Sequence, residues 1–265
     1  MFKKTFALLF SVTAYVLFLG AFAYLVAFTM NLTPHAISGE ATIPPVWAAV
    51  IDVALVTLFA LQHTIMARPW FKRAWTRIVP EHLERSVFVL VATAVMGLVV
   101  LAWQPIGGTI WNVSGAGMFT LATISAIGWT AVPAVSFLTD HFELFGLRQA
   151  YEYATGQKAT KPEFKMRAIY KQVRHPMMLG FLMGLWATPL MTTSHMLFAG
   201  LFTAYIAVGT IFEERDLVTA HGDAYRKYQQ EVPKFVPIHM FSGPDGYTIT
   251  QMKPETTGET RKVAG

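Results

Sequence analysis

The chain has no cysteine and few charged residues. The lack of cysteine excludes disulfide bonds, thiolate nucleophiles and metal sites built from thiolates. Only 14% of the residues are charged, against roughly 25% in ordinary soluble domains, whereas 54% are hydrophobic. The composition is therefore that of a membrane protein. Its chemistry must depend on His, Glu, Asp, Arg, Tyr or Gln side chains, or on a cofactor.

Four long apolar runs stand out, and they cover residues 5–30, 45–66, 86–103 and 116–139. The first run carries no charge and is far longer than the apolar core of a signal peptide. It is long enough to cross a hydrocarbon layer about 30 Å thick, as an α-helix rises about 1.5 Å per residue. We therefore expect four membrane-spanning helices, the first of them retained.

A fifth apolar region, residues 177–212, is too long for one ordinary span. Pro189 and the polar group at 192–195 interrupt it, which predicts a broken helical hairpin. Gly180 and Gly184 have the small-xxx-small spacing that permits close helix approach. The predicted fold is an all-α, polytopic membrane bundle in one domain. Its parts are four spans (5–139), a cytoplasmic loop (140–176), the hairpin (177–212), a C-terminal segment (213–240) and a tail (248–265).

Lysine and arginine are distributed unevenly among the connecting loops. Residues 31–44 and 104–115 contain neither, whereas residues 67–85 and 140–176 are rich in both. Positively charged loops stay on the cytoplasmic side of a membrane. The pattern predicts that the N-terminus, the C-terminus and both basic loops are cytoplasmic.

Distinctive polar residues gather at the two ends of the predicted hairpin. Arg174 and His175 precede its first helix, with Pro176 in the first turn, and Glu213 and Glu214 lie at the end of its second helix. Because a hairpin returns the chain to the same membrane face, these side chains are expected to meet. Carboxylates can hold an ammonium group and arginine can hold a carboxylate, so the cluster suits a zwitterionic ligand. A salt-bridge cluster that closes the hairpin is the alternative.

The motifs between residues 166 and 237 resemble the isoprenylcysteine carboxyl methyltransferase and phospholipid methyltransferase superfamily. The pattern combines residues 170–180, the broken hairpin, the glutamate pair, Tyr225 and the run 232–237. In that superfamily these segments build the pocket for S-adenosylmethionine. The resemblance therefore implies S-adenosyl-L-methionine as cofactor. It also implies these cofactor-binding residues: Tyr170, Val173, Arg174, His175, Pro176, Gly180, Glu213, Glu214 and Tyr225.

Two positions depart from that superfamily pattern. Ala168-Ile169 stands where the superfamily often has Gly-Pro, and Met178 stands where it usually has a tyrosine. We therefore expect a differently shaped pocket beside the transferred methyl group.

Upstream motifs narrow the resemblance to the NnrU-like branch of this superfamily. They lie at residues 61–69, 84–86, 103–105 and 140–149. Within that branch the chain most resembles the bacterial methanethiol S-methyltransferases, which methylate methanethiol to dimethyl sulfide. The resemblance implies a small apolar thiol as substrate and the bacterial inner membrane, with a cytoplasmic active site, as location.

A small thiol is mostly protonated near neutral pH, since even a cysteine thiol has a pKa of about 8.5. His63 and His141, near the cytoplasmic ends of the second and fourth spans, could accept its proton. Arg148 could favour the thiolate. Hydrogen-bonded interfacial histidines and an ordinary positive-inside arginine are the alternatives for these three predicted catalytic residues.

Two other functions stay open. One is a methyltransferase for a lipid-like acceptor, either a prenylcysteine carboxylate or a phospholipid amine. The other is a non-enzymatic transporter, against which stand the lack of internal repeats and the crowding of polar motifs on one face. We expect the lipid bilayer as a partner, but no nucleic acid. No metal is expected, because the histidines form no His-x-x-His or Glu-x-x-His pair.

Overall fold

The computed structural model describes residues 2–157 and 168–236. Five long helices dominate it, and each is long and apolar enough to cross a membrane. The predicted all-α polytopic membrane fold is thereby confirmed, and the chain is an integral membrane protein. The five helices are α1 (Phe2–Thr29), α2 (Pro45–Ala67), α4 (Glu81–Ala102), α5 (Gly115–Thr139) and α9 (Thr193–His221).

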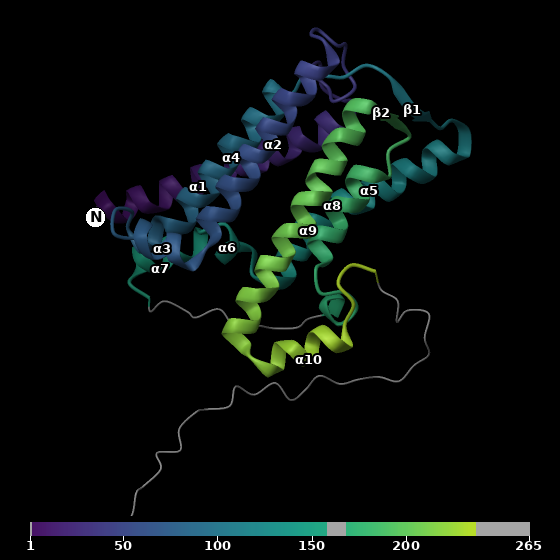
Figure 1. The fold of residues 1–265 in the computed structure, drawn as a ribbon. Helices are drawn as coiled ribbons and strands as arrows, with labels where there is room; N and C mark the ends of the chain where they lie inside the picture. The colour runs from purple at the N-terminus through teal and green to yellow at the C-terminus, as the bar shows by residue number, and fades with distance from the viewer. Residues whose placement is uncertain (1, 158–167, 237–265) are drawn as a thin grey trace, which may run out of the picture.

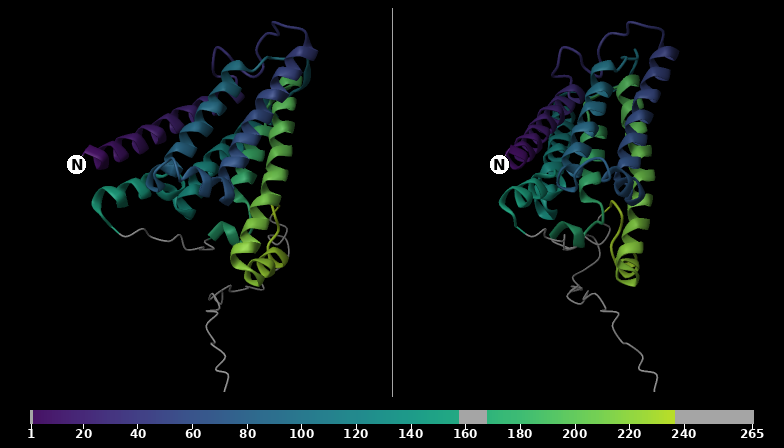
Figure 2. Two further views of the ribbon diagram at one scale, coloured as in Figure 1. Left: turned by 60° about the vertical axis from the view of Figure 1, so that its left-hand side comes forward. Right: turned by 90° about the vertical axis from the view of Figure 1, so that its left-hand side faces the viewer.

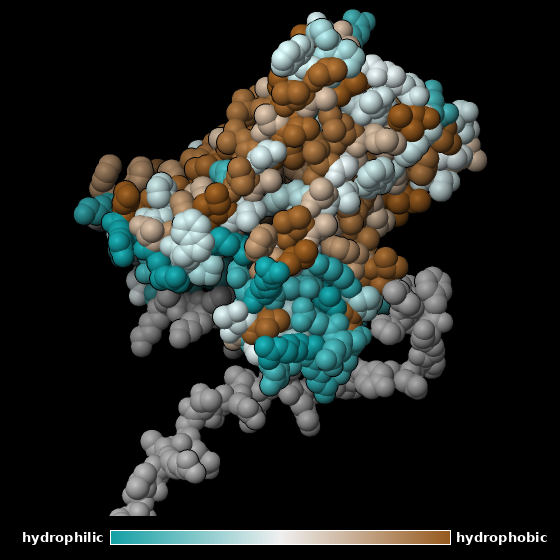
Figure 3. Space-filling model, viewed as in Figure 1, coloured by the Kyte–Doolittle hydropathy of each residue, from teal (hydrophilic) through white to brown (hydrophobic). Residues whose placement is uncertain are grey.

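The long helices run along one another through the molecule, with α1 inclined to the others (Figure 2). Helix α4 packs against both α1 and α2, and α2 packs against α9. Aromatic and branched side chains such as Phe28, Trp103 and Phe198 fill the space between them. On the face that Figure 3 shows, the surface of the long helices is largely apolar, as a lipid-facing surface requires.

Short elements lie at the two ends of the bundle (Figure 1). Strands β1 (Thr109–Asn112) and β2 (Leu190–Thr192) form an antiparallel pair at one end. The opposite end carries the short helices and the most hydrophilic surface (Figures 1 and 3). These short helices are α3 (Pro69–Trp75), α6 (His141–Leu144), α7 (Leu147–Thr155), η1 (Ala168–Lys171) and α10 (Asp223–Glu231).

The region predicted as a hairpin forms one short helix and one long one. Helix α8 (Pro176–Trp186) has 11 residues, so at about 1.5 Å per residue it cannot cross a membrane alone. Helix α9 continues past Phe212 and ends at Gly222, whose φ of 60° belongs to the left-handed region that favours glycine. Glu213 and Glu214 therefore lie within α9, which extends beyond the predicted hairpin boundary at 212. The predicted tail, 248–265, lies outside the described residues.

Helix α8 packs against α5 through facing glycines. A Cβ atom on Gly180 would stand 2.9 Å from the carbonyl oxygen of Gly128. One on Gly184 would stand 2.7 Å from the ring of Trp129. The two glycines thus permit the close approach that their spacing predicts. This packing fixes the start of α8, where Arg174 and His175 lie.

Candidate functional site

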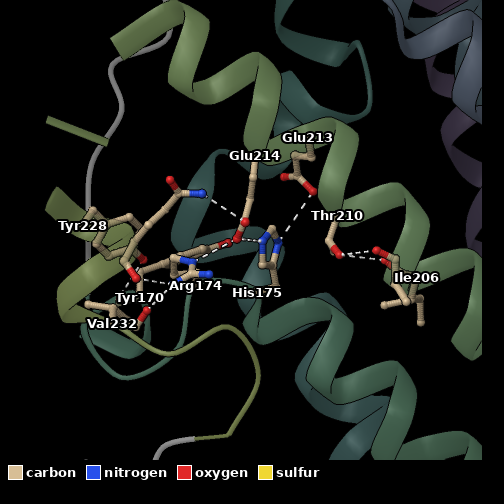
Figure 4. A network of polar contacts seen from close by, with 11 residues as sticks. Tyr170, Arg174, His175, Ile206, Thr210, Glu213, Glu214, Tyr228 and Val232 are labelled. Atoms are coloured by element: carbon tan, nitrogen blue, oxygen red, sulfur yellow. Dashed lines mark hydrogen bonds and ion pairs between the residues drawn. The ribbon is translucent and has the colours of Figure 1, made fainter. Parts of the chain in front are cut away.

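Four side chains predicted to meet do so at the hydrophilic end of the molecule (Figure 4). Arg174 and His175 precede α8, and Glu213 and Glu214 are on the last third of α9. Backbone hydrogen bonds from Arg174 to Pro233 and from His175 to Lys234 tie the chain after α10 to this point. Three segments that are distant in the sequence therefore form one cluster.

Arg174 serves mainly as a clamp within this cluster. Its Nε donates to Glu214 Oε1 at 2.9 Å, and its Nη1 donates to the carbonyl oxygens of Gln229, at 2.7 Å, and Val232. Both Arg174 and Glu214 are largely buried. The salt-bridge alternative thus describes this pair well, because the arginine holds the C-terminal end of α10 against α9.

His175 and Glu213 form the more open half of the cluster. The imidazole lies 2.9 Å from Glu214 through Nε2 and 3.6 Å from Glu213 through Nδ1. Only 4% of the His175 side chain is exposed, whereas 49% of the Glu213 side chain is. Glu213 therefore has the more accessible carboxylate of the pair, whereas His175 and Glu214 are largely buried against each other.

The other predicted cofactor residues surround this cluster. Tyr225 and Tyr228 are buried in α10, and Tyr228 donates a hydrogen bond of 2.6 Å to the carbonyl oxygen of Tyr170. Burial raises the pKa of both α10 phenols and of Tyr170, so all three stay protonated at neutral pH. Val173 is also buried. These residues build the wall of the site.

Pro176 and Gly180 have mainly structural surroundings. Pro176 is the first residue of α8, where a missing N–H costs nothing, and it is buried. Gly180 faces Gly128 in the α5–α8 contact described above. Their predicted contact with a cofactor is tested by nothing in this geometry and stays a prediction.

His63 lies in α2 inside a cage that we define by Phe59, Phe88 and Tyr205. The centroid of its ring is 5.3 Å from that of Phe59, 4.9 Å from Phe88 and 6.3 Å from Tyr205. Its Nδ1 is buried and has no hydrogen-bond partner among the described residues. This imidazole nitrogen is therefore available to a ligand in an apolar setting.

His141, in α6, has both ring nitrogens engaged. Nε2 lies 2.6 Å from the hydroxyl of Tyr15, and Nδ1 lies 2.6 Å from the hydroxyl of Ser136. Because Ser136 donates its own hydrogen to the carbonyl oxygen of Pro133, it must accept one from Nδ1. Nε2 then accepts from Tyr15. Burial lowers the pKa of His141, so the ring is a neutral, fully satisfied linker.

Arg148, at the start of α7, is already paired. It forms ion pairs with Asp140 and with Glu143, the latter at 3.2 Å. The same region contains an arginine that the sequence did not single out as a site residue, namely Arg85 in α4. Its guanidinium lies 4.9 Å from the ring centroid of Phe88, next to His63. The sequence feature that could have identified Arg85 as a site residue was its position in the motif at 84–86, beside an apolar run.

No group of three or more His, Asp or Glu side chains that could hold a metal ion occurs within residues 2–157 and 168–236. The polar groups gathered here instead suit an organic ligand with a positive charge, at Glu213, and a small apolar group with an acidic hydrogen, at His63.

Known proteins resemble this chain over most of its length. The model of the family described as NnrU protein matches residues 52–242. Methanethiol S-methyltransferase of Crocosphaera subtropica is 42% identical over 238 residues, which cover 89% of this chain and 93% of that protein. Methanethiol S-methyltransferase of Mycobacterium tuberculosis is 41% identical over 237 residues, covering 89% and 97%.

A more distant relative is Nurim of Xenopus laevis, which is 27% identical over 187 residues, covering 67% of this chain and 65% of Nurim. No solved structure matches. The matched residues include the His63 cage, Arg148 and the cluster at the start of α8. From the extent of these matches, the chain belongs to the NnrU protein family.

Proposed function

We propose that this protein is a membrane methyltransferase that methylates the sulfur of methanethiol to give dimethyl sulfide. The observation that carries the proposal is the 42% identity to a methanethiol S-methyltransferase across 89% of the chain. The geometry supports it, because an exposed carboxylate on α9 and an imidazole on α2, whose Nδ1 has no hydrogen-bond partner among the described residues, lie on helices that pack against each other.

We propose S-adenosyl-L-methionine as the methyl donor, and the cluster at α8 and α9 has the chemistry to hold it. When bound, this cofactor supplies a methyl group on a positively charged sulfur, together with an ammonium and a carboxylate. Glu213 is the open acid for a cationic group, and His175 lies against it. Arg174, Glu214 and the α10 tyrosines act by fixing the wall against which it binds.

His63 is the proposed acceptor of the thiol proton. The S–H bond would break, the proton would move to Nδ1 of His63, and the thiol sulfur would keep the electron pair that forms its bond to the methyl carbon. The bond between that carbon and the sulfur of the donor would break at the same time, leaving a neutral thioether. Phe59, Phe88 and Tyr205 surround the ring with apolar surface, which excludes water and suits a methyl-sized substituent. His141 and Arg148, whose polar atoms are engaged, maintain the structure in this proposal.

Helix α9 connects the two halves of the proposed site. Tyr205 is one of the three residues of the His63 cage, and Glu213 follows Tyr205 by eight residues on the same helix. At about 1.5 Å per residue, this separation is about 12 Å along the helix axis. The thiol would thus react deeper in the bundle than the point where the cationic group of the donor binds.

The proposed location is the bacterial inner membrane, with the end that carries α3, α7 and α10 in the cytoplasm. The basic residues Arg68, Lys72 and Arg73 of this end support that orientation. A soluble donor would then reach the site from the cytoplasm, and a small apolar thiol could reach it from the bilayer.

The test is direct. The purified protein, in detergent or nanodiscs, is mixed with methanethiol and S-adenosylmethionine, and dimethyl sulfide is measured by gas chromatography. Production of dimethyl sulfide is the expected result. Methylation of a prenylcysteine or of phosphatidylethanolamine, without methylation of methanethiol, would refute the acceptor. The absence of a thermal shift with S-adenosylhomocysteine would refute the donor.

A further inference from the structure

A thiolate formed beside His63 would stand in an apolar environment that disfavours its charge. Moving an anion from water to such a site costs free energy unless a cation compensates it. The sequence predicts Arg148 as this cation. In the structure, however, Asp140 and Glu143 form ion pairs with Arg148 and neutralise its charge. Another cation is needed near the imidazole.

Arg85 has the position for it. Arg85 and Phe88 are one turn apart on α4, and the guanidinium carbon lies 4.9 Å from the centroid of the phenyl ring. The same phenyl ring lies 4.9 Å, between centroids, from the imidazole of His63. Phe88 therefore has the imidazole and the guanidinium as direct neighbours, which places the charge of Arg85 close to an anion formed at His63.

Arg85 is also incompletely engaged. Its Nε donates a hydrogen bond of 2.7 Å to the carbonyl oxygen of Leu144, at the end of α6. No ion pair joins it to a carboxylate within the part of the chain that the structure describes. Glu84 and Glu143 act on it only at longer range. The hydrogen bond through Nε orients the side chain, and the positive charge is left for another partner.

The charges around His63 come from three elements. Arg85 is on α4, Arg68 directly follows the last residue of α2, and Tyr205 contributes a neutral hydroxyl from α9. Arg68 is neutralised by its ion pair with Asp216, at 2.7 Å. Arg85 is thus the cation that acts on His63 without an ion-pair partner among the described residues.

We propose that Arg85, and not Arg148, stabilises the anionic form of the acceptor at His63 and so restricts the site to acceptors that react as anions. The inference rests on the proposed function. A guanidinium attracts a thiolate strongly in a low-dielectric site, and it repels an ammonium. It would therefore select a thiol over a phospholipid amine, in addition to any restriction on size.

The test uses two thiols of similar size and different acidity, ethanethiol and 2,2,2-trifluoroethanethiol. The fluorinated thiol is the more acidic, since fluorine withdraws electron density from sulfur. It forms the thiolate with less help from the protein. The proteins compared are the wild type, Arg85→Lys, Arg85→Gln and the control Arg77→Gln, which removes an exposed arginine from the same end.

Arg85→Gln should lower kcat/KM for ethanethiol by about 100-fold, the usual effect of removing one electrostatic contact to a developing anion. For the fluorinated thiol, the same substitution should lower kcat/KM by only about tenfold. Arg85→Lys, which keeps the charge, should recover most of the activity, and Arg77→Gln should match the wild type. The thermal shift with S-adenosylhomocysteine should be retained in all four proteins.

Two results would overturn the inference, and they can be told apart. If the wild type is active and Arg85→Gln loses the same factor on both thiols, Arg85 has only the structural role of holding Leu144. A further variant, Arg148→Gln, is measured with the same two thiols. If it changes the ratio of kcat/KM between the thiols and Arg85→Gln does not, Arg148 supplies the charge. A wild-type protein that methylates neither thiol refutes the proposed function itself, and this inference with it.

Discussion

His63 and His141 are two histidines near the same end of the molecule, each near the end of a predicted span, and they differ in what surrounds them. His141 has two hydroxyl partners, one on each ring nitrogen. His63 has aromatic neighbours, and its buried Nδ1 has no partner among the described residues. A satisfied imidazole contributes to stability, whereas a buried ring nitrogen without a partner costs free energy until a ligand or a water molecule pairs with it.

The largest effect in this comparison is expected from His63→Gln. Loss of a proton acceptor lowers turnover by about 10²- to 10⁴-fold, so dimethyl sulfide production should fall by that factor. The thermal unfolding temperature should fall less than in His141→Gln, because no hydrogen bond to Nδ1 is lost within the described residues. His221→Gln, at an exposed position on α9, is the matched control and should keep wild-type turnover. Equal activity in the two variants would remove His63 from the mechanism.

Glu213→Gln should weaken donor binding by about tenfold, since a hydrogen bond to a charged group contributes about 1.5–3 kcal/mol and this carboxylate is half-exposed. The measurement is the dissociation constant of S-adenosylhomocysteine, by calorimetry or thermal shift. Glu40→Gln, which removes an exposed acid at the opposite end, is the control. An unchanged constant would show that Glu213 does not contact the donor.

His141→Gln should destabilise the fold, by about 1–3 kcal/mol, because it disrupts the two hydrogen bonds of the imidazole with Tyr15 and Ser136. The thermal unfolding temperature measures this loss. Tyr15→Phe, which removes one of the two partners, should have a smaller effect in the same direction. A variant at His141 with full stability and no turnover would reverse the roles given to the two histidines.

The pH dependence of stability should carry the signature of His141. Burial lowers its pKa in the folded state, so the unfolded chain binds the proton more readily. Stability is then complete above the ordinary histidine pKa of about 6.5 and declines as the pH falls below it. Unfolding temperatures measured between neutral and acidic pH should show this decline, and His141→Gln should reduce it. An identical decline in that variant would assign the effect to other groups.

Much of the fold could be predicted from the sequence, because hydropathy alone determines which segments enter a membrane. The end of α9 could not be predicted this way. The apolar run stops at Phe212, yet the helix continues through Glu213 and Glu214 until Gly222, because helix formation does not require apolar residues. The shortness of α8 was not predicted either. The apolar composition of residues 177–212 does not show how far before Pro189 the first helix ends.

The cluster of Arg174, His175, Glu213 and Glu214 was predictable from the return of the chain to one face. The different contacts that each of the four side chains makes were not predictable. Arg174 donates to the carbonyl oxygens of Gln229 and Val232, and main-chain acceptors leave no mark in a sequence. Likewise, the ion pairs of Arg148 depend on how α6 folds against α4. So does the lack of an ion pair at Arg85 among the described residues.

The measurement that tests the account most directly is gas chromatography of dimethyl sulfide formed from methanethiol and S-adenosylmethionine by the purified protein, in parallel with His63→Gln. The account predicts steady production by the wild type and a loss of about 10²- to 10⁴-fold in the variant, with equal binding of S-adenosylhomocysteine. A wild-type protein that binds the donor product but forms no dimethyl sulfide would contradict it.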